Sequence, residues 1–238
     1  MLKMKLLFLI ALSAFLLLQI DAQTMTDELR LLVLNAHNNL RSKVAQGQAK
    51  NKDGKKLPKA GNMNKLTYSL TVESFAQEVA NSCYFDSKYV NTTFTNLWAS
   101  AHTTSNYLSP SKALSNSVPS WFSELKKYGL KKLAMDEHPK FNHFTQLSWA
   151  DTKEIGCAVH NCPVLNGPAK LNQQFKWTFV VCNYSPPGNI QEAYIYKSSK
   201  KVGSNCPAEA PVNNKGLCQD PNVTDIHAYE NSRQIIVS

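Results

Sequence analysis

His143 and Glu124 are the two residues of this chain best suited to acid–base chemistry. His143 lies in the run Asn142-His143-Phe144-Thr145-Gln146-Leu147-Ser148-Trp149, and Glu124 follows Trp121 at the spacing Trp-x-x-Glu. An imidazole and a carboxylate can act as general acid and base when both reach a substrate. The alternative, which we favour, is a buried hydrogen-bonded pair that holds the helix bearing Glu124 against the segment bearing His143.

Other combinations of polar residues are weaker candidates for a site. Ser148, His143 and Asp151 have the residue types of a hydrolase triad, but no Gly-x-Ser-x-Gly turn accompanies them. His143 and Ser148 also fall on what is predicted to be one short helix, which disfavours a triad. We expect His37 to be a structural histidine and His102 to be a solvent-facing loop histidine, rather than metal ligands.

The cysteines indicate an oxidising compartment. They are Cys83, Cys157, Cys162, Cys182, Cys206 and Cys218. An even set of this kind in a secreted chain predicts three disulfides, although the count leaves several pairings open. A catalytic thiol is the weaker interpretation because it would leave another cysteine unpaired.

The amino-terminal residues predict the route to that compartment. Lys3 and Lys5 precede an apolar run from Leu6 to Ile20, and Ile20-Asp21-Ala22 offers small residues for cleavage. This pattern is typical of a signal peptide, which we assign to residues 1–22. The apolar run is shorter than the roughly 20 residues that a membrane span requires. We therefore expect a secreted, extracellular protein.

The mature chain is long enough for one sizeable domain. Removing 22 of the 238 residues leaves 216, and we assign residues 23–200 to this domain. Residues 201–238, which are rich in Pro, Asn and Gly, form a cysteine-containing carboxyl-terminal extension. The formal net charge of +9 predicts a basic surface capable of weak contact with anionic glycans or a membrane surface, whereas nucleic acid is not expected as a partner outside the cell.

Helical periodicity dominates the first half of the chain. Apolar residues recur at helical spacing over residues 29–44 and again over 71–83, where they are Val72, Phe75, Ala76, Val79, Ala80 and Cys83. Ser109-Pro110 begins a third helix, which we expect Pro119 to split or restart and Gly129 to end. The polar segment over residues 86–109 lacks clear periodicity.

The residue pattern changes in the second half. Phe175, Trp177, Phe179 and Val181 alternate with the residues between them, which predicts strands. Helices followed by strands favour an α/β fold in which helices cover an antiparallel sheet.

Several motifs together resemble the CAP superfamily, which comprises the cysteine-rich secretory, antigen 5 and pathogenesis-related 1 proteins. Asn142 to Trp149 resembles the first signature of this superfamily, and Phe179 to Asn189, with Cys-Asn-Tyr, Pro and Gly-Asn, resembles the second. The similarity extends to Ala36–Arg41 in the first helix and to Trp121–Glu124 in the third. It covers roughly residues 28–196 with independent motifs in the right order.

The basic loop from Lys50 to Lys59, followed by Asn62-Met63, narrows the resemblance to the venom allergen-like (activation-associated secreted) proteins of parasitic nematodes. The resemblance implies a disulfide-stabilised three-layer α-β-α sandwich with an antiparallel central sheet. It also implies three pairings, which are Cys83 with Cys162, Cys157 with Cys182, and Cys206 with Cys218.

Members of this family present two histidines and two acidic residues in a central cavity, where the histidines can bind a divalent metal such as zinc. Glu124 and His143 match two of these positions, but Ser87 stands where the other histidine is expected and Thr95 where the other glutamate is expected. A serine hydroxyl is a poor zinc ligand at neutral pH. We therefore expect no tight metal site and no cofactor.

The resemblance also implies lipid binding. In sterol-binding members an aromatic-containing loop just before the first signature contributes to the site, and a separate groove between helices holds fatty acid. Residues 131–142 occupy the loop position, and Phe141, Phe144 and Tyr128 are the apolar candidates for ligand contact. A cationic rim surrounds Tyr128, formed by Lys126, Lys127, Lys131 and Lys132.

Three sequons for N-glycosylation occur, at Asn91, Asn183 and Asn222. Asn183 lies in the second signature beside Cys182, where a packed strand would exclude a glycan. Asn91 and Asn222 are therefore the expected acceptors.

The resemblance favours a secreted, non-enzymatic protein that binds lipid, either a sterol or a fatty acid such as palmitate, and modulates the host as a parasite effector. One alternative is a protein-interaction effector that engages a host receptor through exposed loops such as residues 50–59. A further alternative is a metal-assisted hydrolase that uses His143 and Glu124.

Overall fold

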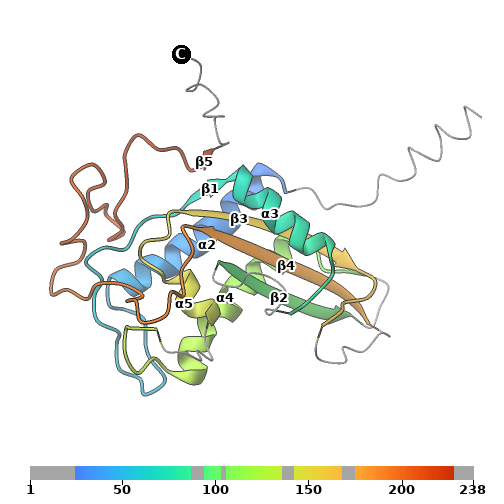
Figure 1. The fold of residues 1–238 in the computed structure, drawn as a ribbon, viewed down its shortest axis with the longest axis horizontal. Coiled ribbons are helices and arrows are strands. Elements are labelled where there is room, and N and C mark those ends of the chain that lie inside the picture. Colours follow the sequence, from blue (N-terminus) through green and yellow to red (C-terminus); the bar gives the residue numbers. More distant parts are fainter. Residues whose placement is uncertain (1–24, 87–93, 103–105, 136–141, 168–174, 228–238) are drawn as a thin grey trace, which may run out of the picture.

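The structure is a computed structural model that describes residues 25–86, 94–102, 106–135, 142–167 and 175–227. Figure 1 shows the arrangement of its elements. The helices are α2 (Asp27–Ala45), α3 (Leu70–Asn81), α4 (Pro110–Tyr128) and α5 (Asn142–Leu147). The strands are β1 (Thr67–Ser69), β2 (Thr95–His102), β3 (Glu154–Cys162), β4 (Lys176–Ser185) and β5 (Ile226–His227). The predicted signal peptide at residues 1–22 lies outside the described residues.

Each of the three long helices begins at a hydroxyl cap, which satisfies a backbone N–H that has no partner within the helix. The side chain of Thr26 accepts from the N–H of Leu29 in α2, and Ser69 and Ser109 cap α3 and α4 in the same way. Gly129 ends α4 with a φ of 81°, a left-handed conformation that glycine adopts without a steric penalty.

Pro119 does not split the third helix, so that prediction was wrong. Helix α4 continues without interruption from Pro110 to Tyr128. A proline removes one helical hydrogen bond and leaves the carbonyl four residues earlier without its partner. Here that residue, Ser115, and Pro119 itself are exposed, so water can satisfy the carbonyl. Packing of Val118 and Trp121 in the core holds both halves of the helix in line.

The strands form one mixed sheet in the order β2-β4-β3-β1-β5. Strand β4 pairs antiparallel with both β2 and β3, whereas β1 pairs parallel with β3 and with β5. The prediction of a purely antiparallel sheet was therefore wrong at one edge, where the strands are too short to produce a residue pattern. Strand β2 was missed because it lies in the polar segment before Ser109.

Helices cover both faces of the sheet, which confirms the three-layer α-β-α sandwich (Figure 1). Successive side chains of β4 point to opposite faces of the sheet, so the strand contributes to the core on both sides. Val180 and Cys182 belong to the core formed with α2 and α4, whereas Phe179 and Val181 belong to the core formed with α3. Helix α5 lies on the same side as α4 and carries the first signature.

The three disulfides join the pairs that the family resemblance implied. Cys157 and Cys182 are register partners on β3 and β4. Cys83, just after α3, is bonded to Cys162 at the end of β3, so this bridge ties one helical layer to the sheet. Cys206 is bonded to Cys218 within the carboxyl-terminal extension.

The described part of the extension packs against the rest of the protein. Leu217 is fully buried in a cluster with Val44 and Met63. The backbone N–H of Cys218 donates to the carbonyl of Met63, and the N–H of Lys65 donates to the carbonyl of Cys218. Leu217 and Cys218 of the extension are therefore part of the core of the domain, whereas residues 221–224 are exposed.

Arg41 of α2 is a fully buried charge at the centre of these connections. Its guanidinium donates hydrogen bonds to the carbonyls of five residues, which are Asn64, Leu147, Trp149, Ala150 and Thr152. Burial lowers the pKa of Arg41 to about 9, so the side chain remains charged at neutral pH. One side chain thus joins α2 to the segment before β1 and to the segment that follows α5.

Replacing Arg41 with Met should reduce the free energy of unfolding by about 3 to 5 kcal/mol, because buried carbonyls would lose their donors. Urea unfolding measures this change. Lys43→Met, on the exposed side of the same helix, is the control; it removes a charge that lies over the Phe122 ring and should reduce the free energy of unfolding by no more than about 1 kcal/mol. A change at Arg41 as small as that at Lys43 would contradict this role.

Removal of the Cys83–Cys162 bridge should destabilise the protein more than removal of the Cys206–Cys218 bridge. The two bridges span 79 and 12 residues of sequence, and the loop-entropy relation assigns them about 4.5 and about 3 kcal/mol. Double Cys→Ala variants compared by urea unfolding measure the difference. If the variant without the Cys206–Cys218 bridge lost as much free energy of unfolding as the other or more, loop-closure entropy would not explain the relative contributions of the two bridges.

Candidate functional site

The structure brings Glu124 and His143 together. The ring Nδ1 of His143 donates to Glu124 Oε1 at 2.7 Å, and the backbone N–H of Phe144 donates to Glu124 Oε2 at 3.0 Å. Both carboxylate oxygens therefore fix the end of α4 to the start of α5, as the structural interpretation predicted. The pair is only partly buried, since the side chains of Glu124 and His143 are 17% and 33% exposed.

The orientation of His143 is fixed by its neighbours. Its ring stacks on Trp121 with the ring centroids 6.1 Å apart, and the Trp121 indole N–H donates to the carbonyl of Leu97. The Asn96 amide donates to the backbone carbonyl of His143 at 3.1 Å. Because Nδ1 is held by the carboxylate, Nε2 is the nitrogen left to meet a ligand or a proton.

The other two tetrad positions do not complete a metal site in the described part of the chain. Ser87 lies outside the described residues. The Thr95 hydroxyl donates to Asn183 Oδ1 at 2.8 Å across the β2–β4 pair, and no hydrogen bond among the described residues joins it to His143. Structural and catalytic zinc sites need three or four protein ligands, whereas the described residues supply one imidazole nitrogen here.

A second group of metal-ligand types lies at the far end of the sheet. Within the residues that the structure describes, Cys83, His160 and Cys162 are the one trio whose ligand atoms lie within 4.8 Å of one another. The two sulfur atoms are joined in a disulfide and are not thiolates, the form that binds metals. This trio therefore does not form a metal site in the oxidised protein.

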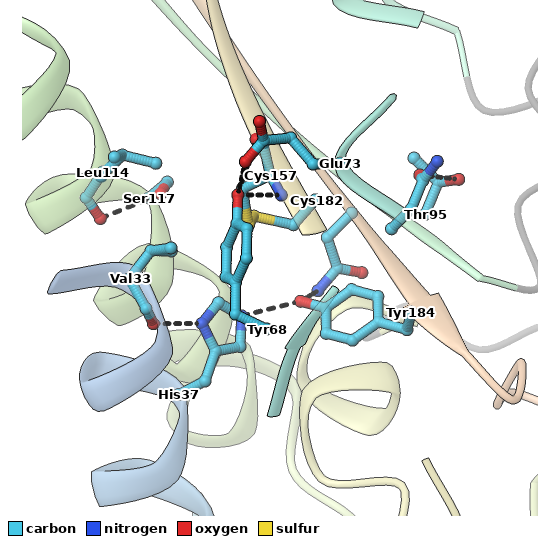
Figure 2. Close-up of a disulfide and its surroundings, with 12 residues drawn as sticks. Val33, His37, Tyr68, Glu73, Thr95, Leu114, Ser117, Cys157, Cys182 and Tyr184 are labelled. Carbon is cyan, nitrogen blue, oxygen red and sulfur yellow. Dashed lines mark hydrogen bonds between the residues drawn. A yellow bond between two sulfur atoms is a disulfide. The ribbon is translucent and has the colours of Figure 1, made fainter. Parts of the chain in front are cut away.

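His37 lies in a buried hydrogen-bond chain beside the Cys157–Cys182 bridge (Figure 2). Its Nδ1 donates to the Val33 carbonyl at 2.8 Å, so its Nε2 accepts from the Tyr184 hydroxyl at 2.9 Å. The amide of Asn96 donates to the same hydroxyl at 3.0 Å. Complete burial lowers the pKa of His37 to about 4, which keeps it neutral. His37 is therefore a structural histidine, as predicted.

The two signature segments are also joined directly. The Thr145 hydroxyl donates to Asn189 Oδ1 at 2.6 Å, and the backbone N–H of Gly188 donates to Gln146 Oε1 at 3.0 Å. Thr145 and Gln146 of the first signature are thus held by Asn189 and Gly188 of the second. Ser148 is fully buried and Asp151 is exposed, so the imagined hydrolase triad is not assembled.

The lipid-contact candidates have different environments. Phe144 is fully buried and packs edge-on against Phe122, with ring centroids 5.5 Å apart, so its assignment to a ligand surface was wrong. Helix α5 directs it into the core. Tyr128 is 39% exposed, with the ammonium of Lys127 over its ring. Phe141 lies outside the described residues.

Two lysine-rich segments that are distant in sequence meet at the end of α4. The Asn51 side chain donates to the carbonyl of Leu130 and accepts from its backbone N–H, both at 2.8 Å. The loop over residues 50–59 therefore lies against the segment over residues 126–132, with Lys52 beside Gly129. The lysines of both segments are exposed, and we call this region the basic surface.

A groove of about 1080 Å³ lies between α3 and the end of β4, and we call it the α3 groove. Helix α3 and its two cap residues contribute Ser69, Thr71, Val72, Phe75, Glu78, Val79 and Ser82 to the lining. The rest of the lining consists of Tyr84, Phe94, Glu154, Asn183, Tyr184, Ser185 and Pro187. Phe75 is 54% exposed. The sequence signal for this groove was the broad apolar stripe of the helix, which the sequence analysis did not connect with a ligand site.

The predicted glycosylation sites and His102 lie in different environments. Asn183 is buried and hydrogen-bonded to Thr95, which leaves no room for a glycan. Asn222 lies in an exposed turn, and Asn91 lies outside the described residues. His102 ends strand β2 and is partly buried, so its assignment to a solvent-facing loop was wrong.

Protonation of His37 should make stability fall on acidification. The unfolded imidazole has its ordinary pKa of 6.5, and the native one titrates at about 4, so between these values the unfolded state alone takes up a proton. The free energy of unfolding should therefore fall by about 3 kcal/mol from pH 7 to pH 4 through this group. Urea unfolding of His37→Gln should show a correspondingly smaller slope with pH. An unchanged slope would contradict the assignment.

None of the helices in the described ranges is long and apolar enough to cross a membrane.

The sequence profile of the cysteine-rich secretory protein family (CAP) matches residues 34–184. The Ancylostoma secreted protein of Ancylostoma caninum is 30% identical over 205 residues, which cover 83% of this chain and 45% of that relative. This chain thus spans less than half the length of that relative.

Venom allergen 5 of Vespula flavopilosa is 32% identical over 176 residues, which cover 70% of this chain and 78% of that protein. The crystal structure of NaASP2 with Zn²⁺ superposes with a TM-score of 0.70 at 30% identity, covering 84% of this chain and 98% of that one. The structure of BmVAL-1 gives a TM-score of 0.67 at 27% identity, covering 82% and 95%. With its signatures, disulfides and sandwich fold, the chain belongs to the cysteine-rich secretory protein (CAP) family.

Proposed function

We propose that this protein is a secreted CAP protein that binds lipid, a sterol or a fatty acid such as palmitate, and that it modulates a host without catalysis. The observation that supports lipid binding is the α3 groove. Its volume of about 1080 Å³ is at the upper end of the range for small-molecule sites. Its walls carry aliphatic and aromatic side chains from α3, β4 and Phe94.

The exposed apolar surface of the groove favours occupancy by an apolar ligand. Phe75 and Val79 lie one turn apart on the same side of α3, and Phe75 is more than half exposed. Burial of apolar surface contributes roughly 25 cal/mol per Å². A hydrocarbon chain that covers Phe75 therefore gains binding free energy without requiring a change in the core.

A non-enzymatic function is consistent with the arrangement around His143. Its partner Glu124 also binds the Phe144 N–H, and its ring is held by Trp121. One structure of a relative is described with Zn²⁺, but Thr95 of this chain is committed to Asn183. We therefore do not include a metal in the proposed function, and the metal-assisted hydrolase is the least favoured alternative.

Extracellular action is supported by the relatives that are named as secreted proteins or venom allergens. The signal-peptide pattern at residues 1–22 and the three disulfides agree with an oxidising compartment. A second candidate function, binding of a host receptor, is favoured by the basic surface that Asn51 and Leu130 bring together. It would be carried by lysines, at a surface distinct from the α3 groove.

The purified protein should take up labelled cholesterol or palmitate saturably. Phe75→Ala should weaken uptake by about tenfold, because a buried aromatic contributes at least 1.4 kcal/mol or so to binding. Ile190→Ala is the control, since Ile190 is similarly exposed but does not line the groove. Absence of saturable uptake of either lipid would overturn the proposal, and equal losses from both variants would remove the α3 groove as its site.

A further inference from the structure

The charge of the α3 groove is opposite to that of the protein as a whole. The chain carries a formal net charge of +9. Among the described lining residues, however, the charged side chains are Glu78 and Glu154, and none is Lys, Arg or His. An apolar groove with carboxylates at its rim favours a ligand that combines a hydrocarbon chain with positive charge.

The two carboxylates are not equivalent. Glu154 begins β3, and its Oε1 lies 3.5 Å from Nε2 of His227. It lines the groove beside Ser69 and Thr71, at the start of α3, where the helix dipole is positive. The Glu154 end of the groove is therefore partly compensated.

At the Glu78 end, the described residues supply no positive charge that pairs with the carboxylate. Glu78 lies in the last turn of α3, which contains no basic residue, and within the ranges that the structure describes no ion pair reaches it. The free carbonyls at a helix carboxyl terminus add a partial negative charge that favours cations. Carboxylate and helix end thus act on the same part of the groove.

The length of the groove matches one lipid chain. From Thr71 to Ser82 the helix advances 11 residues, or about 16 Å at 1.5 Å per residue. Half of a bilayer hydrocarbon core, the depth that one lipid chain fills, is about 15 Å. Between the two ends the helix presents Val72, Phe75 and Val79 to the groove.

We propose that the α3 groove selects a single-chain amphiphile with an amine headgroup, whose ammonium lies beside Glu78 and whose hydrocarbon chain extends over Phe75 toward Glu154. This inference rests on the proposal that the α3 groove binds lipid, and it assigns a headgroup, an amine, that differs from the sterol and fatty acid named above. A fatty acid bound in the same orientation would place its carboxylate against Glu78. Like charges near 4 Å repel even in a water-like medium, by an amount that weakens binding about fivefold.

The test is a matched pair of probes, dodecylamine and dodecanoate, titrated below their micelle concentrations into the full-length protein by calorimetry. The amine should bind roughly fivefold or more tightly than the carboxylate. Glu78→Gln should reduce the affinity for the amine by about threefold. Glu209→Gln, an exposed glutamate in the extension, removes the same charge away from the groove and should leave the preference intact. Added salt should weaken amine binding to the wild type more than to Glu78→Gln.

The outcomes separate the inference from the function on which it rests. If dodecanoate binds as tightly as dodecylamine, or if Glu78→Gln keeps the full preference, the amine assignment is wrong while lipid binding stands. If dodecylamine, dodecanoate, cholesterol and palmitate all fail to bind saturably, both proposals fall. If Phe75→Ala weakens the binding of dodecylamine and Glu78→Gln reduces its affinity relative to dodecanoate, the amine site is established.

Discussion

The architecture depends on one buried charge, Arg41. A guanidinium without a carboxylate partner is unfavourable in a protein interior unless its donors are all used. Here five backbone carbonyls from two distant segments accept its hydrogen bonds. Arg41 therefore fixes the end of the first signature and the residues that follow it against α2 and Asn64.

A second set of polar contacts extends from α2 to His143. Val33, His37, Tyr184 and Asn96 are linked in sequence by hydrogen bonds, and Asn96 then reaches the carbonyl of His143. Glu124 adds hydrogen bonds from α4, since its carboxylate accepts from the His143 ring and from the backbone N–H of Phe144. Residues of the types that catalyse reactions in other proteins here connect α2, α4, α5 and the sheet. This is why a histidine and a glutamate in contact do not by themselves indicate an active site.

The surface divides into regions of opposite character. The basic surface around Asn51 and Leu130 lies at the end of α4, whereas the apolar groove with its two carboxylates runs along α3 on the other face of the sheet (Figure 1). The lysines are thus kept apart from the apolar area of the groove. The separation allows a ligand in the groove and an anionic partner on the basic surface to bind without competing for the same residues.

The sequence by itself determined the features that arise from local pattern or from motif identity. The start of α4 at Ser109, its stop at Gly129 and the cysteine pairs were predictable, because each depends on nearby residues or on a family signature. Only the tertiary structure decided which apolar residues are covered. Phe144 and Phe75 are both aromatic residues on helices, yet one is fully buried and the other is half exposed. The direction of β1 and β5 and the meeting of Asn51 with Leu130 were likewise undetermined, since burial and pairing depend on neighbours far away in the chain.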